Sequence, residues 1–370
     1  MPRGGSDMAR NVLLAAIAVI ASILFISCQE SVTDSTDSDS ASGSTLDVVL
    51  DRGQLICGVK VDTPGFGVLN PDGSRAGNDV EFCRAVAAAI FSDESKVDFV
   101  EATSSNRFDL LAAGEIDVLI RTTTWTASRD ADLGADFVTT TFYDGAGVMV
   151  SNKMVQDKGI DSVKKLDGAT VGVLKGTSTE GAISDFASEN GITLNQKTYE
   201  DNAPLRQAFI DGVVDAWSSD KSQLGGHQFA LNEEGIGAVV LPETLSKEPL
   251  GPVTRDNDSE FHDVVQWVVF GMIIAEEQGV TSSNVSQMAS NPPNNTVARL
   301  LGVGFNDGPP SNMNIGHGKI PLTFMQDVIS KVGNYGEVYS STLEKVGLTR
   351  AGSLNASYQD GGLIYASPMR

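Results

Sequence analysis

A weak internal repeat is the feature of this sequence that most constrains its fold. FDLLAAGEIDVLI (108–120) and RQAFIDGVVDAW (206–217) each read as a helix end, a glycine, an aspartate and a short apolar strand. Alignment on the glycines makes three pairs of positions correspond: Gly114 with Gly212, Asp117 with Asp215, and Thr122 with Asp220. The repeat predicts two lobes of the same topology. A chance match over so few positions is the alternative.

The surrounding chain reads as alternating strands and helices. A buried strand is predicted at 54–59 and another at 96–101. Between them, Asn78 with Glu81 three residues later is typical of a helix start with Asn78 as its cap. This order indicates α/β lobes with mostly parallel sheets, and the folded part is expected to begin near Leu46.

Polar clusters follow several of the predicted strands. They are RTTT (121–124), KGTST (175–179) and SSD (218–220). Open α/β sheets bind ligands at the carboxyl ends of their strands. We therefore expect two facing lobes to bring these clusters to one cleft.

The first 27 residues have the layout of a secretory signal. Two arginines precede an apolar run, 12–26, that is too short for a comfortable membrane span. Because the run ends in Ser27-Cys28, we expect removal of residues 1–27 and lipidation of Cys28, with ordinary cleavage as the alternative. Residues 28–46 are polar and are expected to form a flexible tether. The chain is predicted to be exported, periplasmic or at the cell surface, and held to the membrane only through this anchor.

Charge and cysteine content narrow the function classes. With 26 basic and 48 acidic residues the net charge is −22, which argues against nucleic acid as a partner. If Cys28 carries lipid, Cys57 and Cys83 remain as an even pair in a compartment that permits disulfides. We expect a Cys57–Cys83 bridge, and two buried free thiols are the alternative.

The polar clusters contain the residue types that a small zwitterion needs. An α-amino acid presents a carboxylate and an ammonium close together. Arg129 can give a carboxylate two parallel charge-assisted bonds, and Asp220 can supply the charge opposite an ammonium. The alternatives are an exposed arginine that pairs with a neighbouring aspartate, and a turn residue at Asp220.

Other candidates surround this pair. Thr177 and Ser178 at a helix start can donate from hydroxyl and amide groups, or they can simply cap the helix. Trp125 and Phe66 can stack on a ligand side chain, or they can belong to the core.

Signals for catalysis are thin. The histidines, His227, His262 and His317, lack metal-ligand spacing, and no nucleophile motif, P-loop or dinucleotide fingerprint is present. We expect no catalytic residue, no metal and no cofactor.

The segment RTTTWTASRD (121–130) closely resembles the ligand-site segment of general L-amino-acid-binding proteins of ABC transporters, which are family 3 solute-binding proteins. Further segments resemble the same group: FCRAVAAAIF (82–91), LSKEPLGP (245–252), VGNYGE (332–337) and GGLIYASPMR (361–370). The likeness runs from about Leu46 to the C-terminus, and only the set of segments together is specific.

The resemblance implies an α/β fold, the type II periplasmic-binding-protein clamshell, in which two wound lobes are joined by two crossing strands. The crossings are expected near 146–150 and 247–253, with lobe one at 47–147 and 253–370 and lobe two at 148–252. The resemblance further implies a monomer that closes on an L-amino acid with broad specificity. It would deliver this ligand to the permease of an ABC importer.

The resemblance also carries over roles for individual residues by motif. These are carboxylate binding for Arg129, hydroxyl or amide donation for Thr122, Thr124, Thr177 and Ser178, ammonium binding for Asp220, and contact with the ligand side chain for Phe66. Relatives often carry Asn where this chain has Thr122.

Two other functions share the implied fold, and fold alone does not decide between them. One is a dehydratase acting on a cyclic amino-acid precursor, with Glu101 or Asp144 as its general acid. The other is a sensor domain, against which we note that no transmembrane or signalling segment follows the lobes.

Overall fold

The computed structural model describes residues 43–311 and 313–370. The predicted signal peptide, the lipidation site Cys28 and most of the predicted tether lie outside the described residues. The fold begins with helix α2 (Thr45–Arg52), which Ser44 caps by accepting a hydrogen bond from the Asp47 N–H at 3.4 Å. Leu46 is completely buried in the core. The folded part therefore starts at Ser44, slightly earlier than the tether boundary that the sequence suggested.

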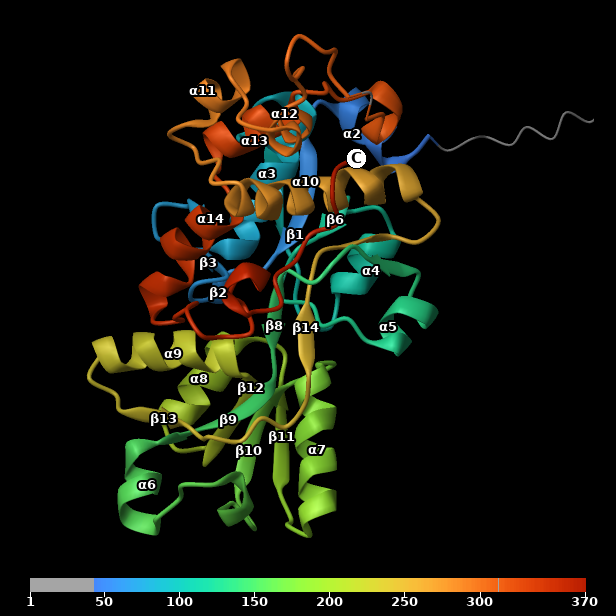
Figure 1. The fold of residues 1–370 in the computed structure, drawn as a ribbon. Coiled ribbons are helices and arrows are strands. Elements are labelled where there is room, and N and C mark those ends of the chain that lie inside the picture. The colour runs from blue at the N-terminus through green and yellow to red at the C-terminus, as the bar shows by residue number, and fades with distance from the viewer. Residues whose placement is uncertain (1–42, 312) are drawn as a thin grey trace, which may run out of the picture. The chain divides into compact units, whose positions relative to one another are not determined.

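The first lobe is built around a sheet with the strand order β5-β1-β6-β15-β7 (Figure 1). Its strands are β1 (Leu55–Val59), β5 (Val97–Glu101), β6 (Val118–Leu119), β7 (Ala135–Phe137) and β15 (Val253–Arg255). β5, β1 and β6 run parallel, whereas β15 runs antiparallel to both of its neighbours. A small antiparallel sheet of β2 (Asp62–Thr63), β3 (Gly67–Leu69) and β4 (Arg75–Ala76) occupies the loop after β1.

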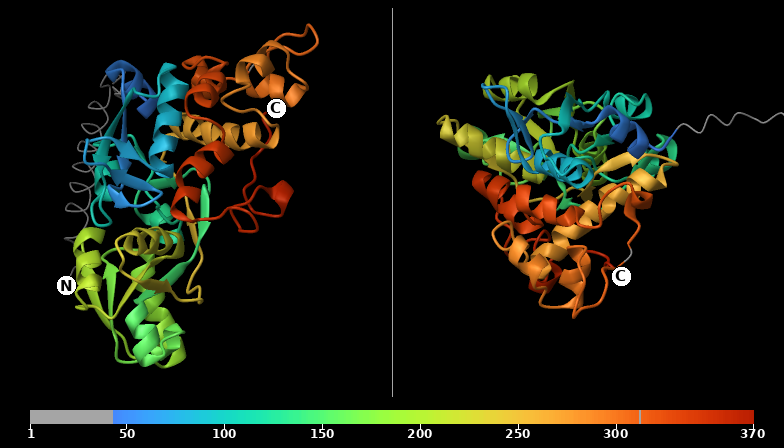
Figure 2. Two further views of the ribbon diagram at one scale, coloured as in Figure 1. Left: turned by 90° about the vertical axis from the view of Figure 1, so that its left-hand side faces the viewer. Right: turned by 90° about the horizontal axis from the view of Figure 1, so that it is seen from above.

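Helices cover both faces of this sheet. Successive strand residues point to opposite faces, and Val118 and Leu119 accordingly belong to two different buried apolar clusters. The helices are α3 (Asn78–Phe91), α4 (Arg107–Ala112), α5 (Ala127–Asp132), α10 (Ser259–Glu277), α11 (Val285–Ser290), α12 (Asn295–Leu300), α13 (Phe324–Lys331) and α14 (Tyr335–Thr342). In Figure 2 the orange and red segments, which follow β15, gather on the side of the lobe where α3 packs. Within the described ranges, no helix has both the length and the apolar character needed to cross a membrane.

The prediction that Asn78 caps helix α3 is wrong. Gly77 is the N-cap residue, and Asn78 is already helical. Gly77 is required because its φ is 131° and a Cβ there would lie 2.1 Å from the Phe66 carbonyl oxygen. Further along α3, Cys83 is bonded to Cys57 of β1, so the predicted disulfide is confirmed.

The second lobe repeats this arrangement in its sheet, whose order is β11-β10-β12-β9-β13. The strands are β9 (Ala146–Ser151), β10 (Thr170–Leu174), β11 (Asn195–Tyr199), β12 (Ala216–Asp220) and β13 (Ala238–Val240), and the helices are α6 (Asn152–Lys158), α7 (Ser178–Asn190), α8 (Asn202–Ile210) and α9 (Lys221–Glu233). β11, β10 and β12 run parallel, and β9 runs antiparallel to both of its neighbours. The matching topologies confirm the repeat and the predicted fold class of two wound α/β lobes.

Two antiparallel strands connect the lobes, β8 (Phe142–Asp144) and β14 (Glu248–Leu250). Figure 1 shows them side by side between the two sheets. The second crossing falls inside the expected range 247–253. The first lies before the expected range 146–150, because that segment is buried within the second lobe's sheet as β9.

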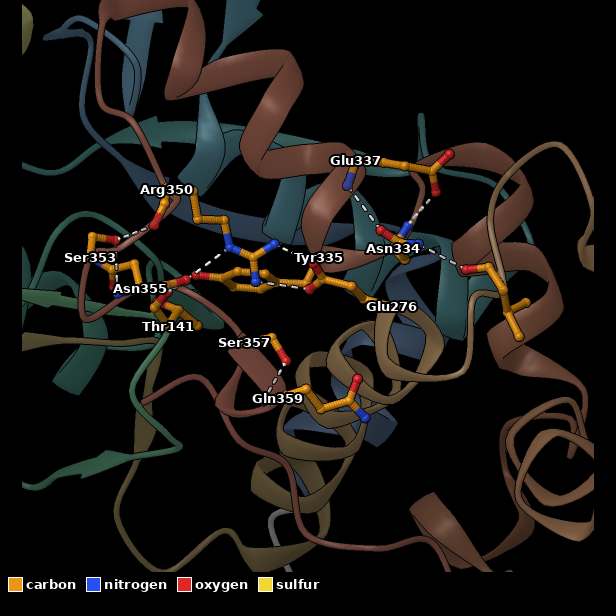
Figure 3. Close-up of polar contacts among 11 residues, drawn as sticks. Thr141, Glu276, Asn334, Tyr335, Glu337, Arg350, Ser353, Asn355, Ser357 and Gln359 are labelled. Atoms are coloured by element: carbon orange, nitrogen blue, oxygen red, sulfur yellow. Dashed lines mark hydrogen bonds and ion pairs between the residues drawn. The ribbon is translucent and has the colours of Figure 1, made fainter. Parts of the chain in front are cut away.

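The C-terminal segment holds the first crossing strand along the edge that β14 does not occupy. Asn355 accepts a hydrogen bond from the Tyr143 N–H at 2.7 Å and donates its amide to the Tyr143 carbonyl at 3.0 Å. Nearby, the Tyr335 hydroxyl donates to the Thr141 carbonyl at 2.8 Å (Figure 3). Arg350 lies over the Tyr335 ring, 4.8 Å from its centroid. These contacts tie the region between the lobes to the end of the chain.

Candidate functional site

A small hollow lies where the carboxyl ends of the two sheets face each other. Its walls come from the residue after β1, the loop after β6, the loop after β10 and the end of β12. The predicted site residues that line it are Thr122, Thr124, Arg129, Thr177, Ser178 and Asp220. The rule that ligand sites form at strand ends therefore locates the hollow.

Arg129 brings a buried cation to this hollow from the first lobe. It lies in α5, whose cap Thr126 accepts a hydrogen bond from the Arg129 N–H at 3.4 Å. Its guanidinium donates to the Thr124 carbonyl at 2.8 Å and, across the cleft, to the Gly176 carbonyl at 3.5 Å. Burial lowers the pKa of Arg129, and the charges of Glu248 and Asp220 oppose this shift. No carboxylate forms an ion pair with the guanidinium in the described chain, so it is available to an anion.

The N-terminus of α7 faces the same space from the second lobe. Thr177 caps this helix: its hydroxyl accepts from the Glu180 N–H at 3.2 Å and donates to the Leu174 carbonyl at 2.7 Å. The Ser178 hydroxyl lies 3.1 Å from that of Thr124, so hydroxyls of the two lobes meet. A helix N-terminus beside a guanidinium and two hydroxyls is suited to bind a carboxylate.

Asp220 supplies the opposite charge from the end of β12. It is 4% exposed, and one carboxylate oxygen accepts a hydrogen bond from Gln223 while the other has no hydrogen-bond partner. Burial raises its pKa well above the usual range, and the charges of Asp144 and Glu248 raise it further. A cationic ligand group at the unpaired oxygen would favour the ionised carboxylate.

Thr122 adopts a backbone conformation that is unusual for its residue type. Its φ is 51°, in the left-handed region that β-branched residues rarely occupy. Its hydroxyl donates to the Arg121 carbonyl at 2.7 Å, and its backbone N–H donates to the Asp79 carboxylate. The strained turn directs the loop after β6 along the wall of the hollow.

The two predicted aromatic residues do not line the hollow. Phe66 is 1% exposed and packs edge-on against Phe142, with ring centroids 5.4 Å apart. Trp125 is 39% exposed and stacks on Phe137 at 5.6 Å. Phe66 therefore belongs to the core of the first lobe, whereas Trp125 stacks on Phe137 and remains exposed.

Three buried cations in the hollow were not selected from the sequence. Lys60 follows β1 directly, Arg121 follows the strand that contains β6, and Arg107 begins α4. The strand-end rule would have found Lys60 and Arg121, since both stand immediately after predicted strands. Arg107 carries no such signal, because only the tertiary fold turns the start of α4 towards the cleft.

Acidic residues of the crossing strands lie behind the site. Ser178 donates its hydroxyl to Glu248 of β14 at 2.6 Å, a partner that the sequence did not indicate. Asp144 of β8 is buried and accepts hydrogen bonds from Ser222 and from the Gly145 N–H. Asp144 and the exposed Glu101, the general acids that a dehydratase would need, are not part of the hollow's wall. Among residues 43–311 and 313–370, no cluster of side chains has the makings of a metal site.

Comparison with known proteins places the chain in one family. The sequence profile of the bacterial extracellular solute-binding proteins, family 3, matches residues 55–277, more than half of the chain. The glutamate/glutamine/aspartate/asparagine-binding protein BztA of Rhodobacter capsulatus is 41% identical, with 89% of this chain and 94% of that protein covered. The general L-amino acid-binding periplasmic protein AapJ of Rhizobium johnstonii is 38% identical over the same shares, 89% and 94%.

A solved structure gives the same result at the level of the fold. The ABC transporter periplasmic binding protein of Brucella ovis with glutathione bound superposes with a TM-score of 0.82 at 38% sequence identity. The match covers 89% of this chain and 100% of that one. It includes the C-terminal segment beyond residue 277 that the family profile does not reach.

Proposed function

The chain belongs to the bacterial extracellular solute-binding proteins of family 3, and on that premise we propose that it captures L-amino acids outside the cytoplasm and delivers them to the permease of an ABC importer. The named relatives support this ligand class. One is named for glutamate, glutamine, aspartate and asparagine, and another for L-amino acids in general.

One observation carries the proposal. Arg129 from the first lobe and Asp220 from the second line the same hollow, and both are buried. In the described chain one Asp220 carboxylate oxygen has no hydrogen-bond partner, and the Arg129 guanidinium donates to the neutral carbonyls of Thr124 and Gly176. A buried guanidinium and a buried carboxylate on opposite walls match the two charges that every α-amino acid carries.

The proposed contacts follow from the chemistry of the two walls. Arg129, the Thr124 and Ser178 hydroxyls and the start of α7 hold the α-carboxylate. Thr122 and Thr177 shape the loops that present these donors, and Asp220 binds the α-ammonium. Recognition of groups that all amino acids share permits broad specificity.

Closure of the lobes is the proposed conformational step. Contacts across the cleft in this structure are those that closure would make: the Asn202 N–H donates to Asp62 at 3.0 Å, and Lys60 donates to Gln223. A ligand favours the closed state only by as much as it binds that state more tightly. A zwitterion that touches both walls binds the closed state more tightly than the open state, because Arg129 and Asp220 come from different lobes.

The location of the protein is proposed at two levels. Its family is extracytoplasmic. We further expect lipidation at Cys28, with the polar residues that follow as a tether, and a monomer as the binding unit. Labelling with a radioactive fatty acid that is lost in Cys28→Ser tests the anchor.

The binding site is tested by titration calorimetry of the full-length chain against the common L-amino acids. Arg129→Ala and Asp220→Ala should each weaken binding by about 100-fold or more, because each leaves a buried charge of the ligand unpaired. Lys153→Ala serves as the control, because Lys153 is an exposed residue of α6 that does not line the hollow. Binding that survives both substitutions would reject this site.

A further inference from the structure

Asp220 stands at the start of α9 without capping this helix. It is the N-cap residue, yet within the described chain its carboxylate accepts no capping hydrogen bond from the helix backbone. An N-cap aspartate ordinarily accepts from the second or third N–H of its helix. Here the Ser222 N–H donates to Asp144 of β8 at 3.3 Å, and the Lys221 N–H donates to the Gly145 carbonyl at 2.8 Å. Residues of the first crossing therefore satisfy the helix start, and the Asp220 carboxylate is free to face the hollow.

Gln223 holds this carboxylate with its side chain. It belongs to the first turn of α9, is 4% exposed and lines the hollow together with Asp220 and Lys60. Its side-chain N–H donates to one Asp220 oxygen, and the other oxygen has no hydrogen-bond partner in the described chain. The side-chain oxygen of Gln223 accepts from the Lys60 ammonium. The amide is thus held at both ends.

The chemistry of the two partners fixes the direction of the Gln223 amide. An ammonium has only donors and an ionised carboxylate has only acceptors, so the amide fits between Lys60 and Asp220 in one orientation. Hydrogen bonds in such a chain polarise one another. The positive charge of Lys60 therefore strengthens the bond that Gln223 donates to Asp220.

This chain of hydrogen bonds spans the two lobes. Lys60 follows β1 in the first lobe, whereas Gln223 and Asp220 belong to the second. Burial raises the pKa of Asp220 well above its usual range, the charges of Asp144 and Glu248 raise it further, and the charge of Lys60 opposes the shift. A donor to the ionised carboxylate matters most where this burial is complete, which is in the closed cleft.

We infer that Gln223 is a positioning residue for ammonium binding. Its amide holds the Asp220 carboxylate with one oxygen directed at the ligand ammonium, and its bond to Lys60 couples this arrangement to closure of the lobes. The inference rests on the proposed function, in which Asp220 binds the α-ammonium. Gln223 acts through Asp220 and not through a bond of its own to the ligand.

Titration calorimetry of the full-length chain tests this role. The ligand is L-glutamate or L-glutamine, whichever the wild type binds more tightly. Gln223→Met keeps the length of the side chain and removes both hydrogen bonds, so affinity should fall by about tenfold. Gln228→Met is the matched control on the same helix: Gln228 donates to the Ala238 carbonyl at 2.8 Å and does not line the hollow. This control should keep the wild-type affinity.

A double-mutant cycle with Asp220→Asn separates positioning from a purely structural role. If Gln223 acts through the carboxylate, Gln223→Met in the Asp220→Asn background should lower affinity by about threefold or less, because the charge-assisted bond is already lost. A side chain that only fills space would give the same tenfold loss in both backgrounds.

Additive losses, or an unchanged affinity in Gln223→Met, would overturn the inference. Gln223→Glu decides the question if Gln223→Met does not fold or Asp220→Asn binds too weakly to titrate. It keeps the bond to Lys60 but has no donor for Asp220 at neutral pH, so it should bind at least about tenfold more weakly than the wild type. Wild-type affinity in Gln223→Glu would also overturn the inference. A wild-type chain that binds none of the common L-amino acids contradicts the proposed function itself, which is a distinct result.

Discussion

Asp117 and Asp215 hold the same position in the two lobes. The Asp117 carboxylate accepts a hydrogen bond from the Ile56 N–H at 2.7 Å, and the Asp215 carboxylate accepts one from the Thr170 N–H at 2.9 Å. Each aspartate also donates its own N–H to the carbonyl of the same partner, at 2.9 and 2.8 Å. In both lobes the aspartate therefore fixes the register between the central strand and its neighbour.

This relationship predicts unequal effects of the same substitution. Asp117 has 2% of its side chain exposed and Asp215 has 36%. Asp117→Ala should lower the free energy of unfolding by about 2–3 kcal/mol, because the part-buried Ile56 N–H loses its acceptor and Arg52 loses its ion-pair partner. Asp215→Ala should cost about 1 kcal/mol or less, since water can replace the carboxylate. Chemical denaturation measures both, and equal losses would contradict this explanation.

The left-handed backbone of Thr122 predicts that Asn is a better residue at this position. Thr122→Asn should raise the free energy of unfolding by about 1 kcal/mol, because Asn tolerates positive φ more readily than a β-branched residue does. Thr122→Val is the matched control: it keeps the branched side chain and loses the hydroxyl bond to the Arg121 carbonyl. Thermal unfolding should give the order Asn, Thr, Val from most to least stable. An Asn variant no more stable than the Val variant would show that the turn stores no strain.

The buried Asp144 predicts a pH dependence of stability. Burial raises its pKa from 3.8 to about 6, against the opposing hydrogen bonds of Ser222 and Gly145. Between about pH 4 and pH 6 the folded chain therefore keeps a proton that the unfolded chain has released. The stabilisation from this group is complete below the unfolded pKa and is lost as the pH rises through about 6.

Asp144→Asn removes this contribution while it preserves an acceptor for Ser222 and Gly145. The ligand-free variant should lose less stability than the wild type between about pH 4 and pH 7, by on the order of 1–2 kcal/mol. Asp79 keeps its raised pKa in both proteins, whereas the pKa of Asp220 falls when the Asp144 charge is removed. The difference between the two profiles therefore reports Asp144 together with its effect on Asp220. Denaturation profiles that run parallel over this range would refute the assignment.

The bond between Asn355 and Tyr143 predicts that the end of the chain stabilises the first crossing strand. Tyr143 stands opposite Pro249 in β14, which has no N–H, and Asn355 pairs both backbone groups of Tyr143 from the other edge. Asn355→Ala should lower the free energy of unfolding by about 2 kcal/mol and speed hydrogen exchange at 142–144. Asn355→Asp keeps the acceptor for the Tyr143 N–H but sets a buried carboxylate oxygen against the Tyr143 carbonyl, so it should destabilise the chain at least as much as Asn355→Ala. Unchanged exchange at these residues in the Ala variant would argue against the contact.

Much of the architecture was predictable, because it depends on local patterns. Apolar strands bounded by glycine and polar loops, and the repeated Gly and Asp positions, indicated two wound lobes. The start of α3 was misassigned because Asn78 and Glu81 look like a helix start from their local spacing alone. The cap is Gly77, since the Phe66 carbonyl lies so close that only glycine fits at that position. The first crossing was placed late because only one residue, Gly145, separates β8 from β9, and the sequence shows no longer loop between them.

Some residues of the candidate site were recognisable from the sequence, and the surroundings of others were not. Thr124, Ser178 and Asp220 stand at or after strand ends and were recognisable from that position, whereas Arg129 was indicated by its residue type and motif. The hollow is lined by all four. Phe66 and Trp125 could equally be core or ligand contacts, since an aromatic residue in a loop does not reveal its neighbours. In the structure Phe66 is buried against Phe142, and Trp125 stacks on Phe137 while it remains exposed.

The sequence by itself determined the class of the fold and the paired cysteines, and it indicated the opposite charges of the proposed zwitterion site, because each depends on residue type and short-range spacing. The tertiary structure alone decided that Lys60, Arg107 and Arg121 join Arg129 at one cleft. It also decided that the C-terminal segment supports the strand between the lobes. Contacts between residues far apart in the chain depend on how whole lobes pack, and the electrostatic environment of a buried charge exists only once those lobes have excluded water.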